Sequence, residues 1–227
     1  MFRTRAVILA QLKMEPLEFK VREALVMQTT DLEQKFRKAN MDLNISENQQ
    51  ISLNAFLEII KLKDIPTYEH SIRVGLKGIE VAKFTHIVEP KALYYPGLLH
   101  DVGKILSNPQ SLKKTDSFDE RDMAEMRKHV LNGYKMLRGI HSFSANVMLC
   151  HHEFQGEKSY PRVLPKSDID YSRGTGAMIA FCGRLLSLID FYDAATFRRT
   201  NKFGTDTTQQ KTSEQVKELL LKHTSIS

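Results

Sequence analysis

Hydrophobic side chains recur at helical spacing through most of the chain. In residues 17–39, for example, the apolar positions fall close to one face of an amphipathic helix. No stretch of useful length alternates apolar and polar side chains as a half-buried β-strand does. The pattern therefore predicts an all-α fold. We expect helices at residues 17–39, 53–62, 66–86, 93–105, 119–137, 142–154, 178–197 and 212–222.

Prolines and polar stretches mark the expected ends of these helices. Pro66 falls at the start of a predicted helix, where proline is tolerated. The pairs Glu89-Pro90 and Asn108-Pro109 predict interruptions, because proline cannot continue a helix from the preceding turn. Residues 40–54 are mostly polar and predict a break around a short turn. Residues 156–176 hold two prolines and three glycines without a period, which is typical of a loop.

The chain divides into an extension and a core on this pattern. Residues 1–60 look like an N-terminal helical extension, and residues 65–227 like the working domain. Thr212 and Gln215 have the spacing of a capping box, which predicts the start of the last helix. Amphipathic helices in the extension make a homodimer through residues 1–60 an open hypothesis.

Composition restricts the possible partners and compartments. The formal net charge is +6, which favours an anionic partner. No stretch reaches the dense Lys/Arg run of a nucleic-acid tail, so no nucleic-acid polymer is expected. Cys150 and Cys182 lie far apart and outside any CxxC pattern, which favours a reducing, cytoplasmic location. No run approaches the roughly 18 apolar residues of a membrane span, and none is expected.

Two adjacent pairs of metal-ligating residue types stand out. His100-Asp101 and His151-His152 each fall late in a mostly apolar segment. Neighbours on a helix point about 100° apart, so such a pair serves a core poorly but can reach two ions about 3.5–4 Å apart. Asp190 lies inside an apolar run, where a carboxylate is costly to bury without a metal or cation. Together these residues predict a metal site.

The donor types predict a pair of ions and not a structural zinc site. His70 and His129 extend the set to seven side chains, and none of them is cysteine. Asp101 has two oxygens and can bridge two ions, while imidazoles supply neutral nitrogen ligands. Such donors suit Fe best, with Mn, Ni and Mg as alternatives. A histidine in an apolar setting is otherwise usually a core residue. That interpretation is kept for the remaining three, His86, His141 and His223.

Several segments carry a resemblance to a known family. LLHDVGKI at residues 98–105 and HHE at 151–153 are the specific ones. The weaker matches are His70-Ser71, His129 with Gly133, Tyr160-Pro161, and residues 190–194. In this order they resemble the HD-GYP family of the HD superfamily of metal-dependent phosphohydrolases, over about residues 66–203. The resemblance implies an all-α HD-domain helical bundle that hydrolyses cyclic di-GMP or a related cyclic dinucleotide.

The resemblance also implies roles for individual residues. One ion would be held by His70, His100, Asp101 and Asp190. The second would be held by His129, His151 and His152, with Asp101 shared. Lys104 matches a phosphate-contacting lysine, and Arg199 and Lys202 fall where relatives grip nucleotide phosphates. Tyr160 either closes its loop over the site or packs. Asp193 is interpreted as a helix cap or a partner within its own helix.

These roles lead to a mechanism. A hydroxide bridging the two ions would attack phosphorus in line, with Asp101 and Lys104 as the catalytic residues. Lys104 would neutralise charge on the phosphoryl oxygens. Arg199 and Lys202 would hold the second phosphate and so reduce the entropic barrier.

Two departures from the family pattern keep other functions open. Ser159 stands where relatives have the first glycine of Gly-Tyr-Pro, and it would strain the loop if that position needs a positive φ. A slow sensor that binds a cyclic dinucleotide is therefore one alternative. Pro66 stands where some relatives place a glutamate for a third ion, so two ions are expected. The other alternative is an HD-type hydrolase of other nucleotides.

Overall fold

The computed structural model describes residues 31–114, 119–153, 159–165, 169–197 and 211–224. Within these ranges all regular structure is helical, which confirms the all-α prediction. Residues 31–42 are helical. The elements that follow are α3 (Glu47–Lys63), α4 (Ile65–Thr85), α5 (Pro90–Leu99), the 3₁₀ helix η1 (Val102–Leu106), α6 (Pro109–Lys113), α7 (Glu120–Leu137), α8 (Ser142–Leu149), α9 (Arg173–Phe197) and α10 (Ser213–Thr224).

The break expected at residues 40–54 is much shorter than predicted. The first helix continues to residue 42, and α3 begins at Glu47. Ser46 and Gln49 form a capping box, in which each side chain satisfies a backbone N–H of the other residue. Polar side chains at a helix start were thus mistaken for a break, because the cap itself is built from polar residues.

Helices α4 and α5 pack closely against each other and bring the first histidines together. A Cβ added at Gly97 would lie 2.8 Å from the Cα of Gly75, so the two backbones meet where neither residue has a side chain. Asp64 caps α4 by accepting a hydrogen bond from the Thr67 N–H at 3.0 Å. Pro66 lies in the first turn, as expected. The close crossing places the rings of His70 and His100 with centroids 5.0 Å apart.

Both ligand pairs lie in turns and not inside helices, which corrects the expectation for residues 93–105 and 142–154. Helix α5 ends at Leu99, and Asp101 has φ −97° and ψ 5° before η1 begins. Helix α8 ends at Leu149, and residues 150–153 form a turn. The apolar pattern continues past both helix ends because the turns are themselves buried. The argument from neighbours 100° apart on a helix therefore does not apply to either pair.

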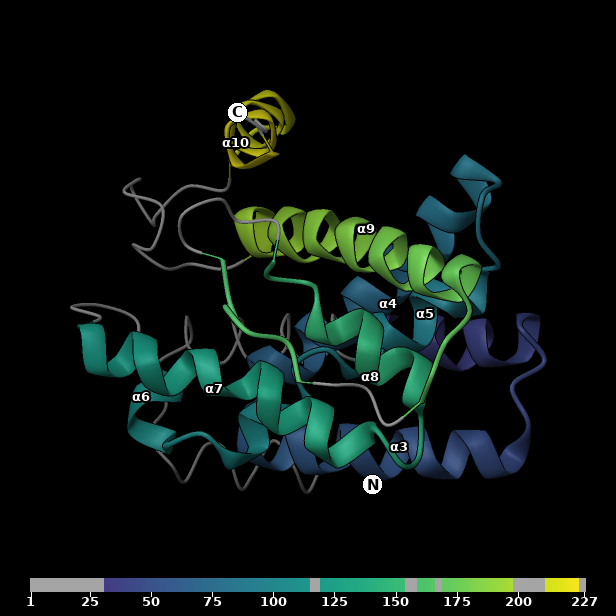
Figure 1. Ribbon diagram of the computed structural model, residues 1–227, viewed down its shortest axis with the longest axis horizontal. Helices are drawn as coiled ribbons and strands as arrows, with labels where there is room; N and C mark the ends of the chain where they lie inside the picture. The colour runs from purple at the N-terminus through teal and green to yellow at the C-terminus, as the bar shows by residue number, and fades with distance from the viewer. Residues whose placement is uncertain (1–30, 115–118, 154–158, 166–168, 198–210, 225–227) are drawn as a thin grey trace, which may run out of the picture.

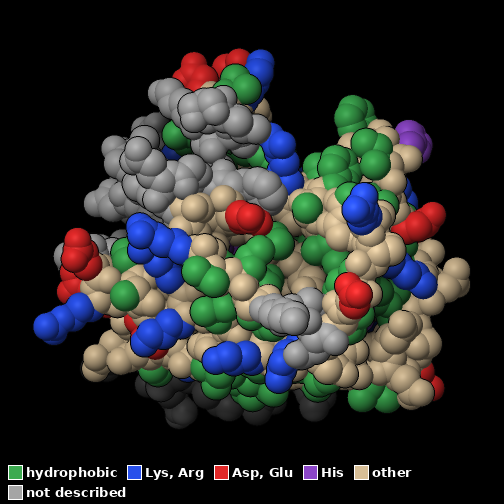
Figure 2. Space-filling model, in the orientation of Figure 1, with side chains coloured by type: hydrophobic (Ala, Val, Ile, Leu, Met, Phe, Trp, Pro, Cys, Tyr) green, Lys and Arg blue, Asp and Glu red, His purple; other side chains and the backbone are tan. Residues whose placement is uncertain are grey.

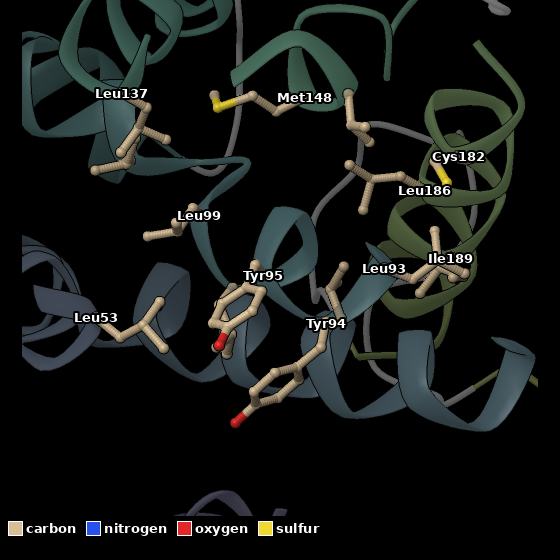
Figure 3. Packing of buried hydrophobic residues seen from close by; sticks show 14 of the residues in the cluster. Leu53, Leu93, Tyr94, Tyr95, Leu99, Leu137, Met148, Cys182, Leu186 and Ile189 are labelled. Atoms are coloured by element: carbon tan, nitrogen blue, oxygen red, sulfur yellow. The ribbon is translucent and has the colours of Figure 1, made fainter. Parts of the chain in front are cut away.

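One apolar core joins the helix at residues 31–42 with α3, α4, α5, α7, α8 and α9. Figure 3 shows Leu53 of α3, Tyr95 of α5, Met148 of α8 and Leu186 of α9 within this cluster. Because α3 buries Leu53, Leu57 and Ile60 in it, the described part of the N-terminal extension packs on the domain. The division into residues 1–60 and 65–227 remains a prediction.

Helix α9 lies across α4, α5 and α8, with α10 on its other side (Figure 1). It starts at Arg173, inside the segment expected to be a loop. The predicted capping box of α10 is confirmed, since the Thr212 N–H donates to Gln215 Oε1 at 2.9 Å. Helix α9 is long and apolar enough to cross a membrane by length and composition. Its Asp190 and Asp193 are buried, and it packs against α4, α5 and α8.

Candidate metal centre

The seven side chains predicted to bind metal meet in the interior of the bundle. Each is buried, with at most 9% of its surface exposed. Histidine is seen almost only at one edge of the face in Figure 2, in keeping with this burial. The seven side chains come from five segments of the chain. These are α4 (His70), the turn after α5 (His100 and Asp101), α7 (His129), the turn after α8 (His151 and His152) and α9 (Asp190).

Ligand atoms from these residues form overlapping groups. Three sets have ligand atoms that all lie within 4.8 Å of one another: His70 with His100 and Asp101, His100 with His151 and Asp190, and His129 with His151 and His152. His70 Nε2 lies 3.2 Å from His100 Nε2 and 3.0 Å from Asp190 Oδ1. Because the sets share members, they form one continuous cluster and not separate sites.

Asp101 lies between the two halves of this cluster. Its Oδ2 is 3.4 Å from His100 Nε2 and 3.7 Å from His70 Nε2. Its Oδ1 lies on the other side, 3.4 Å from His129 Nε2. Each oxygen thus faces a different group of imidazoles, which is the geometry that a carboxylate bridging two cations requires.

Hydrogen bonds at Nδ1 orient the imidazoles. Nδ1 of His100 donates to the Gly97 carbonyl at 2.8 Å, and Nδ1 of His129 to the Met126 carbonyl at 2.5 Å. His151 makes the same bond to Met148, in each case to the carbonyl three residues earlier. His70 instead contacts the Asp193 carboxylate. With the proton at Nδ1, Nε2 carries the lone pair and points into the cluster.

Two of these nitrogens show that the site fits a metal. Nε2 of His129 and Nε2 of His151 are buried and lack a hydrogen-bond partner among the described residues. A buried polar atom without a partner costs about 1–3 kcal/mol, so it needs an explanation. A metal ion accepting the lone pair of each nitrogen removes that cost.

Burial and charge set the protonation states that metal binding needs. Burial lowers the pKa of His129 to about 3 and that of His151 to about 4, so both imidazoles are neutral at pH 7. Burial opposes ionisation of Asp101, but the charges of Lys104 and His100 hold its pKa well below the usual value. Asp190 likewise has a pKa well below its usual value, because its contacts with the His100 and His70 imidazoles outweigh its burial. The neutral imidazoles of His129 and His151, beside the ionised carboxylates of Asp101 and Asp190, are suitable metal ligands.

Lys104 lies directly beside the shared carboxylate. Its Nζ is 2.5 Å from Asp101 Oδ2, and only 7% of the residue is exposed. The residue sits on η1, which packs against α7. A buried ammonium at this position places a positive charge at the edge of the cluster.

Tyr160 packs on the other half of the cluster. Its ring stacks on the His152 ring with centroids 4.3 Å apart, and its N–H donates to the His152 carbonyl at 3.3 Å. The Arg127 guanidinium lies 5.7 Å from the centre of the Tyr160 ring. Tyr160 therefore forms a wall beside His152, between the cluster and an exposed basic residue.

Two expectations concern the loop before Tyr160 and the segment after α9. Among the non-glycine residues whose φ is described, φ is positive at Asn44 and His86. Ser159 directly follows residues 154–158, which lie outside the described ranges, so the strain considered there stays a prediction. Arg199 and Lys202 lie outside the described residues, so the structure does not place them.

Sequence reasoning missed two residues beside the cluster: Asp193, which contacts His70, and Arg73, which contacts Asp193. Asp193 was interpreted as a partner within its own helix, but it bonds to His70 and Arg73 of α4. The signal was available, because Asp193 lies in the same apolar helix as Asp190 and its burial is equally costly. Arg73 lies one turn after His70 and had no distinguishing pattern of its own.

Comparison with known proteins adds a family match and several curated relatives. The family model described as "HD domain" matches residues 67–195. A cyclic di-GMP phosphodiesterase of Pseudomonas aeruginosa is 30% identical over 158 residues, which are 66% of this chain and 36% of the relative. The 3′3′-cGAMP-specific phosphodiesterase 2 of Vibrio cholerae is 26% identical over 82% of this chain and 34% of its own. A cyclic di-GMP phosphodiesterase of Thermotoga maritima is 27% identical over 64% of this chain and 40% of its own. The chain thus matches between about a third and two fifths of the length of these relatives.

Proposed function

The chain belongs to the HD domain family, and from that premise we propose that it is a metal-dependent phosphodiesterase of the HD-GYP type, which hydrolyses a cyclic dinucleotide. The names of the relatives support this substrate class, and cyclic di-GMP is the first candidate. 3′3′-cGAMP is the second, since two relatives are named for it.

The position of Asp101 is the observation that carries this proposal. One carboxylate oxygen faces His70 and His100, and the other faces His129. A site for a single ion would need only one of these groups. Residues placed so that Asp101 could contact two ions would suit phosphodiester cleavage, where both the attacking and the leaving oxygen need charge stabilisation.

We propose two divalent ions at this centre, with Fe as the first candidate. Mn and Ni suit the same mixture of imidazole nitrogens and carboxylate oxygens, whereas Mg prefers oxygen ligands and is the weakest alternative. When bound, such ions supply Lewis-acid chemistry by lowering the pKa of water and polarising a phosphoryl oxygen. The ligand set proposed from the sequence is unchanged: His70, His100, Asp101 and Asp190 at one position, and His129, His151 and His152 at the other, with Asp101 shared.

Residues of the chain would bind and orient the substrate. The Lys104 ammonium, already 2.5 Å from Asp101, stands where it can neutralise charge on the scissile phosphate. Tyr160 offers a ring beside His152 against which a nucleobase or ribose can pack. We propose, as from the sequence, that Arg199 and Lys202 hold the second phosphate.

The two alternatives are weaker than the enzyme. A slow sensor was motivated by the serine at position 159, whereas all seven proposed metal ligands lie together in the cluster. A hydrolase of other nucleotides would need only the first ligand group. The assembly of His129, His151 and His152 in a second group argues against it.

A turnover assay with matched histidine variants tests the proposal. Metal-analysed protein is incubated with cyclic di-GMP, 3′3′-cGAMP and the linear dinucleotide, and products are separated by chromatography. His100→Asn removes a central ligand. His86→Asn is the control, because His86 caps α4 away from the cluster and asparagine tolerates its positive φ of 54°.

The outcomes separate the three functions. Hydrolysis of a cyclic dinucleotide that is lost in His100→Asn and kept in His86→Asn supports the enzyme. Tight binding without product supports the sensor instead. No binding and no turnover with any cyclic dinucleotide removes both and leaves the other nucleotide hydrolases.

We also propose self-association through the N-terminal helices and a cytoplasmic location. Helix α3 exposes an apolar stripe in which Ile51, Ile59 and Leu62 are 61%, 46% and 86% exposed. Deleting residues 1–60 would also remove core residues, so a surface change is the better test. Ile51→Glu, within the extension, should shift a dimer to a monomer in sedimentation experiments. A wild-type protein that sediments as a monomer at all concentrations would exclude self-association.

A further inference from the structure

His70 is held differently from the other oriented histidines of the cluster. His100, His129 and His151 each donate Nδ1–H to a carbonyl three residues earlier, in their own helix or turn. Nδ1 of His70 instead lies 2.7 Å from Oδ2 of Asp193, a residue 123 positions away on α9. The local backbone therefore orients three rings, whereas the orientation of His70 depends on the packing of α9 on α4.

A second residue of α4 holds the Asp193 carboxylate in place. Arg73 lies one turn after His70, and its Nε donates to Asp193 Oδ1 at 2.8 Å. Its Nη2 donates to Oδ2, the oxygen that His70 also contacts, at 3.0 Å. The planar guanidinium fork thus binds both oxygens at once and leaves the carboxylate little freedom to rotate. Asp193 is 3% exposed, so water does not replace these bonds readily.

Arg73 is in turn supported by other side chains. Its guanidinium lies 4.6 Å from the centre of the Phe197 ring, at the last residue of α9. Glu69 approaches it at 4.0 Å on the same helix. The chain of contacts therefore runs from the end of α9 through Arg73 and Asp193 to the ring of His70.

These contacts have a consequence at one side of the cluster only. Asp193 accepts the Nδ1 proton, so the Nε2 lone pair of His70 points toward Asp190, His100 and Asp101. The group of His129, His151 and His152 does not include His70. Loss of the Asp193 contact should therefore disturb one of the two ion positions.

We propose that Arg73 and Asp193 are positioning residues that orient His70, and that they determine how tightly the ion on the His70 side is held. This inference rests on the metal centre of the proposed function. It adds that the two ion positions differ in what orients their ligands. An ion held by His129, His151 and His152 would have two ligands, His129 and His151, that the local backbone orients. The ion held by His70 is the one that depends on the contact between α4 and α9.

An ordinary structural ion pair between α4 and α9 is the competing explanation. Such a pair would affect folding stability without distinguishing the two ion positions. Orientation of a metal-ligating histidine by a carboxylate has a larger and more local effect, since loss of such partners costs about 10–100-fold in metal affinity. The number and affinity of bound ions therefore separate the two explanations.

The experiment uses Mn²⁺ as the probe metal and three variants. Asp193→Asn keeps the shape of the side chain but removes the charge that Arg73 and His70 share. Arg73→Met removes the fork and keeps Asp193. Lys77→Met is the matched control, because Lys77 lies one turn beyond Arg73 on α4, pairs with Glu80 and lies 5.9 Å from the centre of the Tyr192 ring of α9.

Metal content by mass spectrometry and competition with a chelator give the affinities of the two positions. We expect about two ions per wild-type chain and the same for Lys77→Met. In Asp193→Asn one ion should bind about 10–100-fold more weakly while the other is unchanged. Arg73→Met should show a smaller loss at the same position, and electron paramagnetic resonance should then report isolated Mn²⁺ in place of a coupled pair.

Other outcomes overturn the inference in distinguishable ways. A wild-type chain that holds no ions contradicts the proposed function itself. Two ions held with wild-type affinity in both variants, or an equal loss at both positions, contradicts the positioning role alone. Should Asp193→Asn fail to fold, Arg73→Met decides, since Arg73 is partly exposed and its removal leaves no buried cavity in the cluster.

Discussion

The backbone of Gly103 lies directly against the carbonyl oxygen of His129. A Cβ added at Gly103 would be 1.9 Å from that oxygen and 2.5 Å from the nitrogen of Gly133. This contact packs η1 closely against α7 and so sets the distance between Asp101 and His129. The absence of a side chain at Gly103 is therefore a requirement of the metal centre as well as of the packing.

Gly103→Ala should destabilise the fold and weaken metal binding together. The added methyl group meets backbone atoms, which cannot rotate away, and overpacking of this kind costs about 1–3 kcal/mol or more. Denaturant unfolding measures the loss. Gly139→Ala is the control, because an added Cβ there meets nothing within 4 Å. Equal stability of the two variants would contradict the close seating of η1.

Removal of the ions should lower the melting temperature. Ions that bind only the folded state at a concentration about 100-fold above Kd stabilise it by about 2.7 kcal/mol. For a chain of this size we expect a decrease of roughly 5–10 °C after chelation, measured by circular dichroism. Readdition of Mn²⁺ or Fe²⁺ should restore the transition. An unchanged melting temperature in a protein shown to lose its ions would contradict the coupling between the cluster and the fold.

The metal-free protein should lose stability as pH falls below about 6.5. The pKa of His129 is lowered to about 3 and that of His151 to about 4, mainly by burial. In this window the unfolded chain takes up protons that the folded state excludes, so acid favours unfolding. Each such histidine contributes a slope of about 1.4 kcal/mol per pH unit.

The titration of His100, Asp101 and Asp190 also affects stability, mainly outside the pH range in which His129 and His151 act. Burial disfavours charge on His100, but the carboxylates of Asp101 and Asp190 outweigh it and raise its pKa. His100 therefore favours folding fully below pH 6.5, and this contribution is lost as pH rises through its folded-state pKa. Asp101 and Asp190 have lowered pKa values, and their contribution is lost only at more acidic pH. Urea titrations between pH 7 and 4.5 measure the slope. Stability that rises toward pH 4.5 would contradict the neutral state of His129 and His151.

Lys104→Met should reduce turnover more than it reduces metal content. The ammonium lies beside Asp101, where it can neutralise a phosphoryl oxygen, and loss of one such group typically costs about 10²–10³ in kcat. Lys113→Met, on the exposed side of α6, serves as the control for loss of one positive charge. Steady-state kinetics with metal analysis check both. A Lys104→Met enzyme with wild-type kcat would exclude a catalytic role for this residue.

Local pattern was enough to predict the helices and the identity of the clustered residues. Apolar spacing is a property of neighbouring residues, so the helices around His70 and His129 were predicted closely. It failed where polar residues cap a helix, as at Ser46, and where a turn is buried, as at Asp101 and His151. The periodic pattern reports which side chains are buried or exposed. That information alone does not distinguish a helix from the cap or the buried turn at its end.

The sequence by itself determined which metal-ligating residue types this protein carries. It also determined that one of them, Asp101, has a carboxylate that two ions could share. Only the tertiary structure decided that the two oxygens of Asp101 face opposite groups of histidines, and that Asp193 and not a carbonyl orients His70. The physical reason is the range of the interactions. Helix formation and capping involve residues at most a few positions apart, whereas the direction of an imidazole ring here depends on a carboxylate on another helix, more than a hundred residues along the chain.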